Sequence, residues 1–403
     1  MNHEYHHYIS QTAKELKPSG IRKFFDLAAT IKGVISLGVG EPDFITPWSI
    51  REAAILSLEE GYTSYTANPG LLELRQEISA YLSRRFAVEY NPENQVIVTA
   101  GASQAIDLAF RAILNPGDEV LIIEPAFVSY APLVTLAGGT PITVSTRPEN
   151  GFKLTPEQLE NAITNKTKAI LICSPNNPTG TYLNKSELSD LAAVVKKHDL
   201  IVVSDEIYAE LTYDEAYTSF ASIEGMYPRT ILINGFSKGF AMTGWRLGFV
   251  AAPQEFAAQM VKILQYTTMC APHMLQHGAI EALRNTYSEV EAMRRSYRRR
   301  RNYVVQSLNQ IGLDCHMPGG AFYVFPSIKN TGLTSEEFAE QLLIAEKVAV
   351  VPGSAFGESG EGYIRCSYAT SMEQLQEATK RIQRFIESLE INKASIGEIP
   401  AHK

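Results

Sequence analysis

Residues 231–250, with the sequence ILINGFSKGFAMTGWRLGFV, contain the feature around which the rest of the chain is organised. An apolar run ends at Gly235, and one lysine, Lys238, follows it and precedes Arg246. The end of a strand that leaves the core can hold a side chain in place and still leave it reachable. A lysine held there loses its proton once it is desolvated, and its amine can then condense with an aldehyde to a Schiff base. A lysine at such a position is more often a solvated residue at the rim of the fold. Other motifs in the sequence must therefore decide between a solvated and a reactive lysine.

Size and composition place the chain among soluble globular proteins. Its 403 residues exceed one ordinary core, so two closely packed domains are expected. The net charge of −8 disfavours a nucleic-acid binder. No stretch approaches the ~18 apolar residues that span a bilayer, and the N-terminus has no apolar signal core, so a cytoplasmic location without membrane contact is expected. The cysteines are scattered without a C-x-x-C pair, which suits a reducing cytoplasm and no metal site: Cys173, Cys270, Cys315 and Cys366.

One basic run, RRSYRRRR at Arg294–Arg301, is at odds with the acidic balance of the chain. Glu289 and Glu291 precede it within a helical pattern. Mixed charges of this kind are typical of a solvated helix face, and we favour that interpretation over a nucleic-acid surface.

Seven short apolar runs alternate with amphipathic segments after Pro92. Most of them are rich in Val and Ile with little alternation, which is typical of a sheet buried on both faces. We therefore predict an α/β architecture whose central sheet is mostly parallel and seven-stranded. The runs are QVIVTAG, EVLIIEPA, TPITVS, KAILICSP, LIVVSDEIY, TILINGFSK and RLGFVAA.

A smaller α+β unit follows the sheet region. Helical patterns continue beyond Pro253, and the strands GGAFYVFPSI and GYIRCSYA then appear among further helical segments. The N-terminal stretch is too short to form a domain, so we expect it to pack with this C-terminal unit. The predicted division is a large domain over 46–292 and a small domain made of 1–45 together with 293–403.

Two loops at predicted strand ends could contact an anionic ligand, because ligands of open α/β sheets lie at the carboxyl ends of the strands. TAGASQA ends one strand and opens a helix, so the amides near Gly101, Ala102 and Ser103 suit a phosphate. A small-residue turn with a serine N-cap explains the stretch equally well. In CSPNNPTG, the side-chain amide of Asn177 could donate to a phenolate or carboxylate oxygen, although such a turn needs no function.

Four side chains near other strand ends could also contact a ligand. Asp205 ends the apolar run LIVVSDEIY, where an unpaired carboxylate is costly to bury and needs a cation; a helix N-cap is the commoner explanation. Tyr208, three positions later, could reach the same ligand. Phe127 in EPAFVSY could stack on a flat heterocycle or belong to the core. Arg365 in GYIRCSYA suits bidentate capture of a carboxylate, either a ligand's or an internal one.

Taken together, SPNNPTG, SDEIY, NGFSKGFAMTGWRLG and YIRCSYA, in this order, resemble the fold type I, pyridoxal-phosphate-dependent aminotransferases of class I. The similarity runs from SLGVGEPDF to the C-terminal strand. It looks closest to the subgroup of prokaryotic aspartate, aromatic and alanine aminotransferases and to the bacillary aminotransferase A type. It implies pyridoxal 5'-phosphate as cofactor and transfer of an amino group from an L-amino acid to a 2-oxo acid such as 2-oxoglutarate. The donors it leaves open are aspartate, aromatic amino acids, alanine and a diaminopimelate derivative.

The resemblance also implies roles for single residues. Lys238 matches the Schiff-base lysine and Asp205 the partner of the pyridine nitrogen. The residues that match cofactor contacts are Tyr208 and Asn177 at the ring oxygen, Phe127 on the ring face, and Gly101, Ala102, Ser103, Ser237 and Arg246 at the phosphate. One departure concerns the phosphate, because Gly235 stands where some relatives have a serine.

Fewer residues match the positions that contact the substrate than match those that contact the cofactor. Arg365 falls on the arginine that binds the α-carboxylate, assisted by Gly40 and Asn177. Tyr65, in SYTANPG, aligns with a tyrosine that reaches the phosphate of a neighbouring subunit, which implies a homodimer with shared sites. By analogy, the segments KPSGIRKFF and YTANPG line the side-chain pocket.

Two other functions fit parts of the same pattern. A fold type I carbon–sulfur β-lyase uses the same lysine and aspartate, and fold alone does not determine the reaction. A pyridoxal-phosphate-sensing transcription regulator would need a DNA-binding module, for which too few residues precede the first core motif. No second arginine for a side-chain carboxylate is recognisable, so the amino donor stays open.

Overall fold

The structure is a computed structural model, and it describes residues 5–18, 20 and 31–397. The segment 21–30, which includes most of KPSGIRKFF, lies outside these residues. Within the described part of the chain, no helix is long and apolar enough to cross a membrane. The helices Tyr5–Tyr8 (3-10) and α1 (Gln11–Glu15) begin the described chain.

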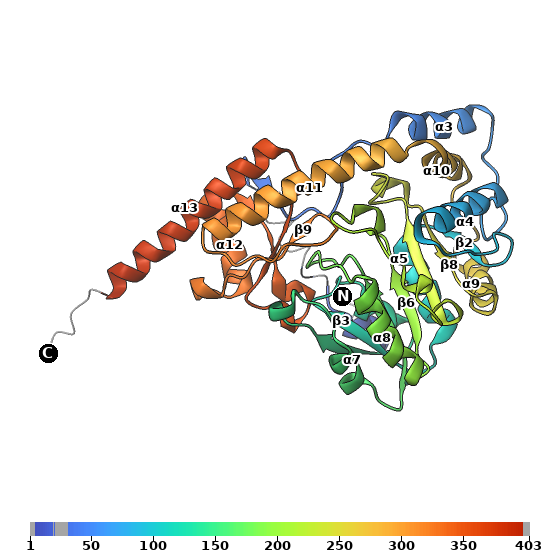
Figure 1. Cartoon of the computed structure of the whole chain (residues 1–403), viewed down its shortest axis with the longest axis horizontal. Helices are drawn as coiled ribbons and strands as arrows, with labels where there is room; N and C mark the ends of the chain where they lie inside the picture. The colour runs from blue at the N-terminus through green and yellow to red at the C-terminus, as the bar shows by residue number, and fades with distance from the viewer. Residues whose placement is uncertain (1–4, 19, 21–30, 398–403) are drawn as a thin grey trace.

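A seven-stranded sheet forms the centre of the larger part of the molecule, as predicted (Figure 1). Its strand order is β2-β8-β7-β6-β5-β3-β4. The five strands from β7 to β4 are parallel, whereas β8 runs antiparallel to both of its neighbours. The strands are β2 (Val96–Thr99), β3 (Glu119–Glu124), β4 (Thr140–Ser145), β5 (Thr167–Cys173), β6 (Ile201–Asp205), β7 (Thr230–Gly235) and β8 (Gly248–Ala251).

Helices bury both faces of this sheet, which explains why its strands are apolar at consecutive positions. In β5, Ile170 packs into one hydrophobic cluster and Leu171 into another, because successive side chains of a strand point to opposite faces. The Ile170 cluster includes apolar residues of α7 and α8, and the Leu171 cluster those of α5. The helices around the sheet are α3 (Trp48–Glu59), α4 (Leu72–Phe86), α5 (Ala102–Ile113), α6 (Tyr130–Leu136), α7 (Pro156–Ala162), α8 (Lys185–Lys197), α9 (Gln254–Thr267) and α10 (His273–Asn285).

In the described chain, the smaller unit is built mainly from two short sheets and the helices α11, α12 and α13. A three-stranded antiparallel sheet has the order β11-β12-β9, and β1 pairs with β10 in parallel. Because β1 comes from the N-terminal stretch, this pairing agrees with the proposed small domain, whose exact boundaries stay a prediction. The elements are β1 (Ile35–Ser36), β9 (Tyr323–Val324), β10 (Val348–Ala349), β11 (Val351–Pro352), β12 (Ile364–Ser367), α11 (Tyr287–Gln310), α12 (Ser335–Glu346) and α13 (Met372–Gly397).

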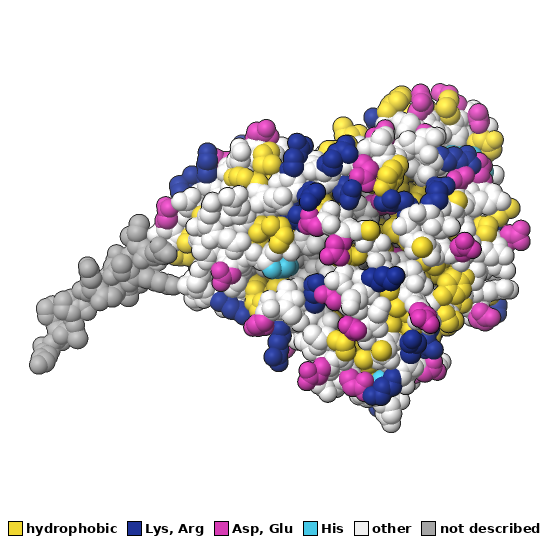
Figure 2. Space-filling view, in the orientation of Figure 1, with side chains coloured by type: hydrophobic (Ala, Val, Ile, Leu, Met, Phe, Trp, Pro, Cys, Tyr) yellow, Lys and Arg dark blue, Asp and Glu magenta, His cyan; other side chains and the backbone are white. Residues whose placement is uncertain are grey.

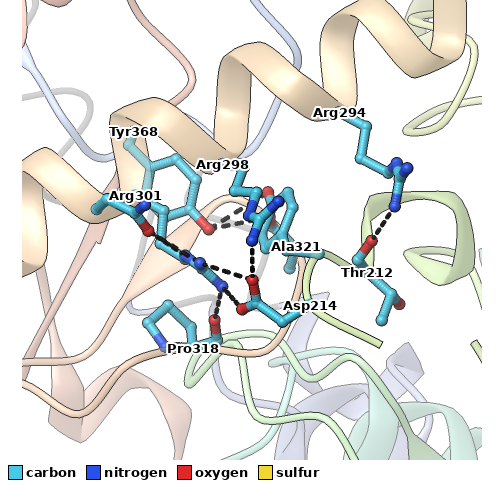
Figure 3. Close-up of polar contacts among 10 residues, drawn as sticks. Thr212, Asp214, Arg294, Arg298, Arg301, Pro318, Ala321 and Tyr368 are labelled. Carbon is cyan, nitrogen blue, oxygen red and sulfur yellow. Dashed lines mark hydrogen bonds and ion pairs between the residues drawn. The ribbon is translucent and has the colours of Figure 1, made fainter. Parts of the chain in front are cut away.

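The basic run lies on α11, which extends along both parts of the molecule, and it is only partly a solvated face (Figures 1 and 3). Arg301 is only 3% exposed, and its Nη1 donates to Asp214 Oδ2 at 2.6 Å. Arg298 pairs with the same carboxylate at 2.9 Å, and Arg294 donates to the Thr212 carbonyl oxygen at 3.2 Å. These three arginines are spaced so that they share one helix face. The prediction of a solvated face was wrong for Arg301, which is buried against a loop distant in sequence, whereas the Arg298 side chain is 54% exposed and Arg294 also pairs with Glu291 of the same helix at 2.7 Å.

The remaining charges of this surface are mixed. On the face drawn in Figure 2, basic side chains lie among acidic ones over the region of α11. Arg300 of the same run binds Asp43 at 2.7 Å. Much of the positive charge of the run is therefore compensated within the chain.

Candidate active site

A pocket of about 580 Å³ opens where the carboxyl ends of β5, β6 and β7 meet the smaller unit. It brings together all of the predicted site residues except Gly101 and Tyr65. The lining residues are Gly40, Glu41, Ala102, Ser103, Ile106, Phe127, Tyr130, Asn177, Asp205, Ile207, Tyr208, Ser237, Lys238, Thr243, Gly244, Arg246, Tyr323 and Arg365.

Lys238 enters the pocket from the turn after β7. Its Nζ donates to the Gly40 carbonyl oxygen at 2.6 Å. The pKa of this amine is lowered to about 8, mainly by burial; Glu41 opposes the shift, and the positive charges of Arg365 and Arg246 contribute to it. A considerable fraction of the amine is therefore neutral near physiological pH, which is the state that a nucleophile or a base requires.

Gly235, the departure noted in the sequence, has a steric reason. A Cβ atom at this position would lie 2.9 Å from Gly248 Cα, on the neighbouring strand. A Cβ atom on Gly248 would in turn lie 2.6 Å from the backbone nitrogen of Ala102, at the start of α5. The two strands and the helix start pack backbone to backbone, so a serine at 235 would not fit without displacement.

Asp205 lies at the end of β6 and is 4% exposed. Its Oδ2 accepts a hydrogen bond from the Tyr130 hydroxyl at 2.6 Å, and its Oδ1 accepts one from the Ile207 amide at 3.2 Å. Burial raises the pKa of this carboxyl, partly offset by these two hydrogen bonds. The carboxylate does not cap a helix, since the next helical turn is capped by Tyr208 without a side-chain bond. No basic side chain in the described chain forms an ion pair with it, so a cationic ligand atom would suit the site.

An anion-binding corner lies at the N-terminus of α5. Gly101 precedes this helix with φ of 92°, and a Cβ atom there would lie 2.6 Å from Arg246 Nη2. The first amides of the helix, the Arg246 guanidinium and the nearby Ser237 together make a cradle for a phosphate group. Gly101 therefore shapes the pocket although its own atoms do not line it.

Arg365 forms the opposite wall, on β12, and is 3% exposed. Its Nη1 donates to Asn177 Oδ1 at 3.0 Å and its Nη2 to the Gly38 carbonyl oxygen at 2.6 Å. Its Nε has no hydrogen-bond partner, and no Asp or Glu of the described residues pairs with it. Of the two partners that the sequence left open for Arg365, the internal Asp or Glu is not found among the described residues. A carboxylate of a ligand would pair with this buried guanidinium.

Aromatic side chains complete the pocket. The Tyr208 hydroxyl lies 2.9 Å from that of Tyr323, and Phe127 is half-buried at the pocket wall. Tyr130 and Tyr323 were not predicted as site residues. A weak signal existed for Tyr130, which lies three residues after Phe127, at a spacing that a helical turn brings to one side. Tyr65 is 77% exposed and lies outside the pocket of its own chain, so its role stays a prediction about a neighbouring subunit.

The chemical content of the pocket fits pyridoxal phosphate. A buried amine with lowered pKa can bind an aldehyde, an unpaired carboxylate can face a ring nitrogen, and the start of α5 with Arg246 can hold a phosphate. The unpartnered Nε of Arg365 leaves a place for a substrate carboxylate.

Comparisons with known proteins identify the class. The family model described as aminotransferase class I and II matches residues 32–382, and the chain belongs to this family. It is a pyridoxal-phosphate-dependent aminotransferase, as the sequence predicted. The chain is 65% identical to the Bacillus subtilis protein YugH over 94% of its own length and 98% of that protein.

Other similar proteins are named for particular substrates. The chain is 51% identical to an aspartate aminotransferase of Pyrococcus abyssi, over 92% of this chain and 96% of the relative. A solved aromatic aminotransferase of Pyrococcus horikoshii superimposes with a TM-score of 0.88 at 48% identity, over 92% of this chain and 99% of that structure. An aspartate aminotransferase of Thermus thermophilus with maleate gives a TM-score of 0.89 at 39% identity, over 93% and 99% of the two chains.

Proposed function

We propose that this pocket transfers the amino group of an L-amino acid to a 2-oxo acid, with Lys238, Asp205 and Arg365 as its central residues. The observation that carries the proposal is that these three side chains, which are distant in sequence, line one pocket, and that no ion pair joins any of them to another residue of the described chain. When bound, pyridoxal phosphate supplies an aldehyde carbon that accepts the amino group and a ring that withdraws electrons.

Lys238 acts as the base that moves a proton from the substrate Cα. Its amine is buried and partly neutral, and the Gly40 carbonyl oxygen orients it through one N–H. Asp205 holds a proton at the pyridine nitrogen, because a nearby negative charge favours the protonated ring. Tyr130 fixes the orientation of this carboxylate.

The other residues position the reactants. With the cofactor bound, Tyr208 and Asn177 would donate hydrogen bonds to its ring oxygen, and Phe127 would contact its ring face. Arg365 and Asn177 hold the α-carboxylate of the substrate beside Gly40, which orients the Cα–H bond relative to the ring. The phosphate contacts that we propose are the amides of Gly101, Ala102 and Ser103 and the side chains of Ser237 and Arg246.

The amino donor is proposed to come from the class used by the relatives, which are named for aspartate, aromatic amino acids and N-acetyl-LL-diaminopimelate. Among the described lining residues, the only Lys and Arg side chains are Lys238, Arg246 and Arg365, which already have roles. A donor carboxylate on the side chain would therefore need a cation from outside these lining residues.

A panel of amino donors with 2-oxoglutarate, compared by kcat/KM, tests this proposal. We expect glutamate formation with at least one aspartate, aromatic, alanine or diaminopimelate-type donor. Release of pyruvate together with ammonia from cystathionine, without an added oxo acid, would instead identify the β-lyase alternative.

We propose a homodimer in which Tyr65 reaches the cofactor phosphate of the partner subunit. Large apolar side chains that are exposed in the single chain support this, because burying them against a second subunit would remove apolar surface from water. They include Ile45, Trp48, Tyr65, Tyr266 and Met269. Sedimentation equilibrium should give twice the mass of the chain, and a monomer with full activity would contradict the proposal. A cytoplasmic location is also proposed, since the four cysteines are free thiols.

Replacement of Arg365 by lysine should raise KM for both the amino donor and the 2-oxo acid by about 10- to 100-fold, since hydrogen bonds to charged groups contribute roughly 1.5–3 kcal/mol. Lysine keeps the charge but loses the planar fork that binds a carboxylate at two points. Steady-state kinetics with each substrate varied would measure the change. Arg381→Lys, on α13 and outside the pocket, is the control. Unchanged KM values for Arg365→Lys would remove Arg365 from carboxylate binding.

A further inference from the structure

Tyr323 links the two structural units at the pocket. It belongs to β9 of the smaller unit and is 1% exposed, whereas Tyr208 follows β6 of the large sheet. Their hydroxyl oxygens are 2.9 Å apart. Neither hydroxyl has another hydrogen-bond partner in the part of the chain that the structure describes, so each depends on the other and on what enters the pocket.

The backbone before Tyr323 is held firmly. Ala321 adopts a left-handed conformation with φ of 57°, which costs energy for a residue with a Cβ and persists only where the surroundings impose it. Its carbonyl oxygen accepts hydrogen bonds from the Tyr213 hydroxyl and from the Tyr368 hydroxyl, the latter at 3.1 Å. Its amide donates to the Leu211 carbonyl oxygen at 3.0 Å.

The arginines of α11 secure the loop on which Ala321 rests. Arg301 and Arg298 bind Asp214, and Arg294 binds the carbonyl of Thr212, on either side of Tyr213 (Figure 3). Three arginines of the basic run thus hold the 212–214 segment in place near the pocket. They fix the segment against which β9 begins.

The Tyr323 side chain has little freedom within the pocket. A Cβ atom on Gly40 would lie 2.9 Å from its hydroxyl oxygen, so the backbone of Gly40 closely covers the hydroxyl. The guanidinium of Arg365 lies over its ring, 4.6 Å from the centroid. The ring therefore supports the proposed carboxylate site, while the hydroxyl is directed to Tyr208.

We propose that Tyr323 is a positioning residue whose hydroxyl donates to Tyr208 and makes Tyr208 a stronger donor to the ring oxygen of the cofactor. The inference rests on the proposed function, in which Tyr208 donates its only hydroxyl proton into the pocket. The proton between the two oxygens then comes from Tyr323. Hydrogen bonds in such a chain polarise one another, so the first bond strengthens the second.

Tyr323→Phe removes the hydroxyl and keeps the ring beneath Arg365. A donor to the ring oxygen favours its ionised form, so weaker donation should raise the midpoint of the pH-dependent visible absorbance change of the holoenzyme by about 0.5 pH unit. KM for the amino donor should change less than twofold, because the ring remains. Tyr303→Phe is the matched control: its hydroxyl also lies 2.9 Å from a single hydroxyl, that of Thr379, but on α11 away from the pocket.

A double-mutant cycle with Tyr208→Phe shows whether Tyr323 acts through Tyr208. In the Tyr208→Phe background, adding Tyr323→Phe should leave the midpoint unchanged. No shift in the single variant, or an equal shift in both backgrounds, would overturn the inference. Wild-type protein that binds pyridoxal phosphate without a pH-dependent visible band would overturn the proposed function first, and the inference with it.

Discussion

Replacement of Lys238 by alanine is expected to lower kcat for transamination by on the order of 10⁴-fold, the upper range for a positioned acid–base group. The buried amine has two proposed tasks, to bind the aldehyde and to move the Cα proton, and alanine can do neither. No other amine of the described chain lines the pocket. Single-turnover measurements with saturating amino donor would report the proton transfer directly.

The control for this variant is Lys262→Ala, an exposed lysine on α9, which should keep wild-type activity. Borohydride treatment of the wild-type holoenzyme, followed by digestion and mass spectrometry, should place the cofactor label on the peptide that contains Lys238. A label on another lysine, or an alanine variant that retains more than a few per cent of wild-type activity, would refute this assignment.

Replacement of Asp205 by asparagine is expected to lower kcat by about 10³-fold. The side chains have the same shape, so the loss reports the negative charge. A charge ~4 Å from the ring nitrogen contributes about 4 kcal/mol at an effective dielectric constant of 20, which corresponds to roughly three factors of ten in rate if the protonated ring is required. The measurement is kcat together with cofactor affinity by equilibrium titration.

Tyr130→Phe provides the matched comparison for this experiment. It removes the hydroxyl that donates to Asp205 Oδ2 and leaves the charge in place. The expected loss is about tenfold, the usual contribution of one hydrogen bond. If Asp205→Asn and Tyr130→Phe lose activity equally, the charge of Asp205 is not what the reaction requires.

Local patterns in the sequence were sufficient to predict the sheet and much of the pocket. Consecutive Val and Ile residues indicated strands buried on both faces, and β5 shows why, since Ile170 and Leu171 pack into different clusters. The motifs around Lys238, Asp205 and Arg365 lie at strand ends, where the topology of an open sheet brings them together.

The contacts that were not predicted join residues far apart in the chain. Tyr208 and Tyr323 are separated by 115 positions, and Asp214 and Arg301 by 87. No local periodicity or charge pattern encodes such a pair, whereas the pair of Glu291 with Arg294, three positions apart, follows the local charge pattern. Tyr130 was overlooked for a similar reason, because it begins α6 and its partner Asp205 ends β6, 75 positions later.

The contact of Gly235 with Gly248, and of Gly248 with the Gly101–Ala102 peptide, has a consequence for attempts to redesign this enzyme. Three backbone segments meet there in direct contact, so a methyl group added to one would press on the others. The displacement would reach both the turn that carries Lys238 and the proposed phosphate site. Variants with new substrate preferences should be sought on the rim formed by Glu41, Thr243 and Gly244, where change would leave that junction intact.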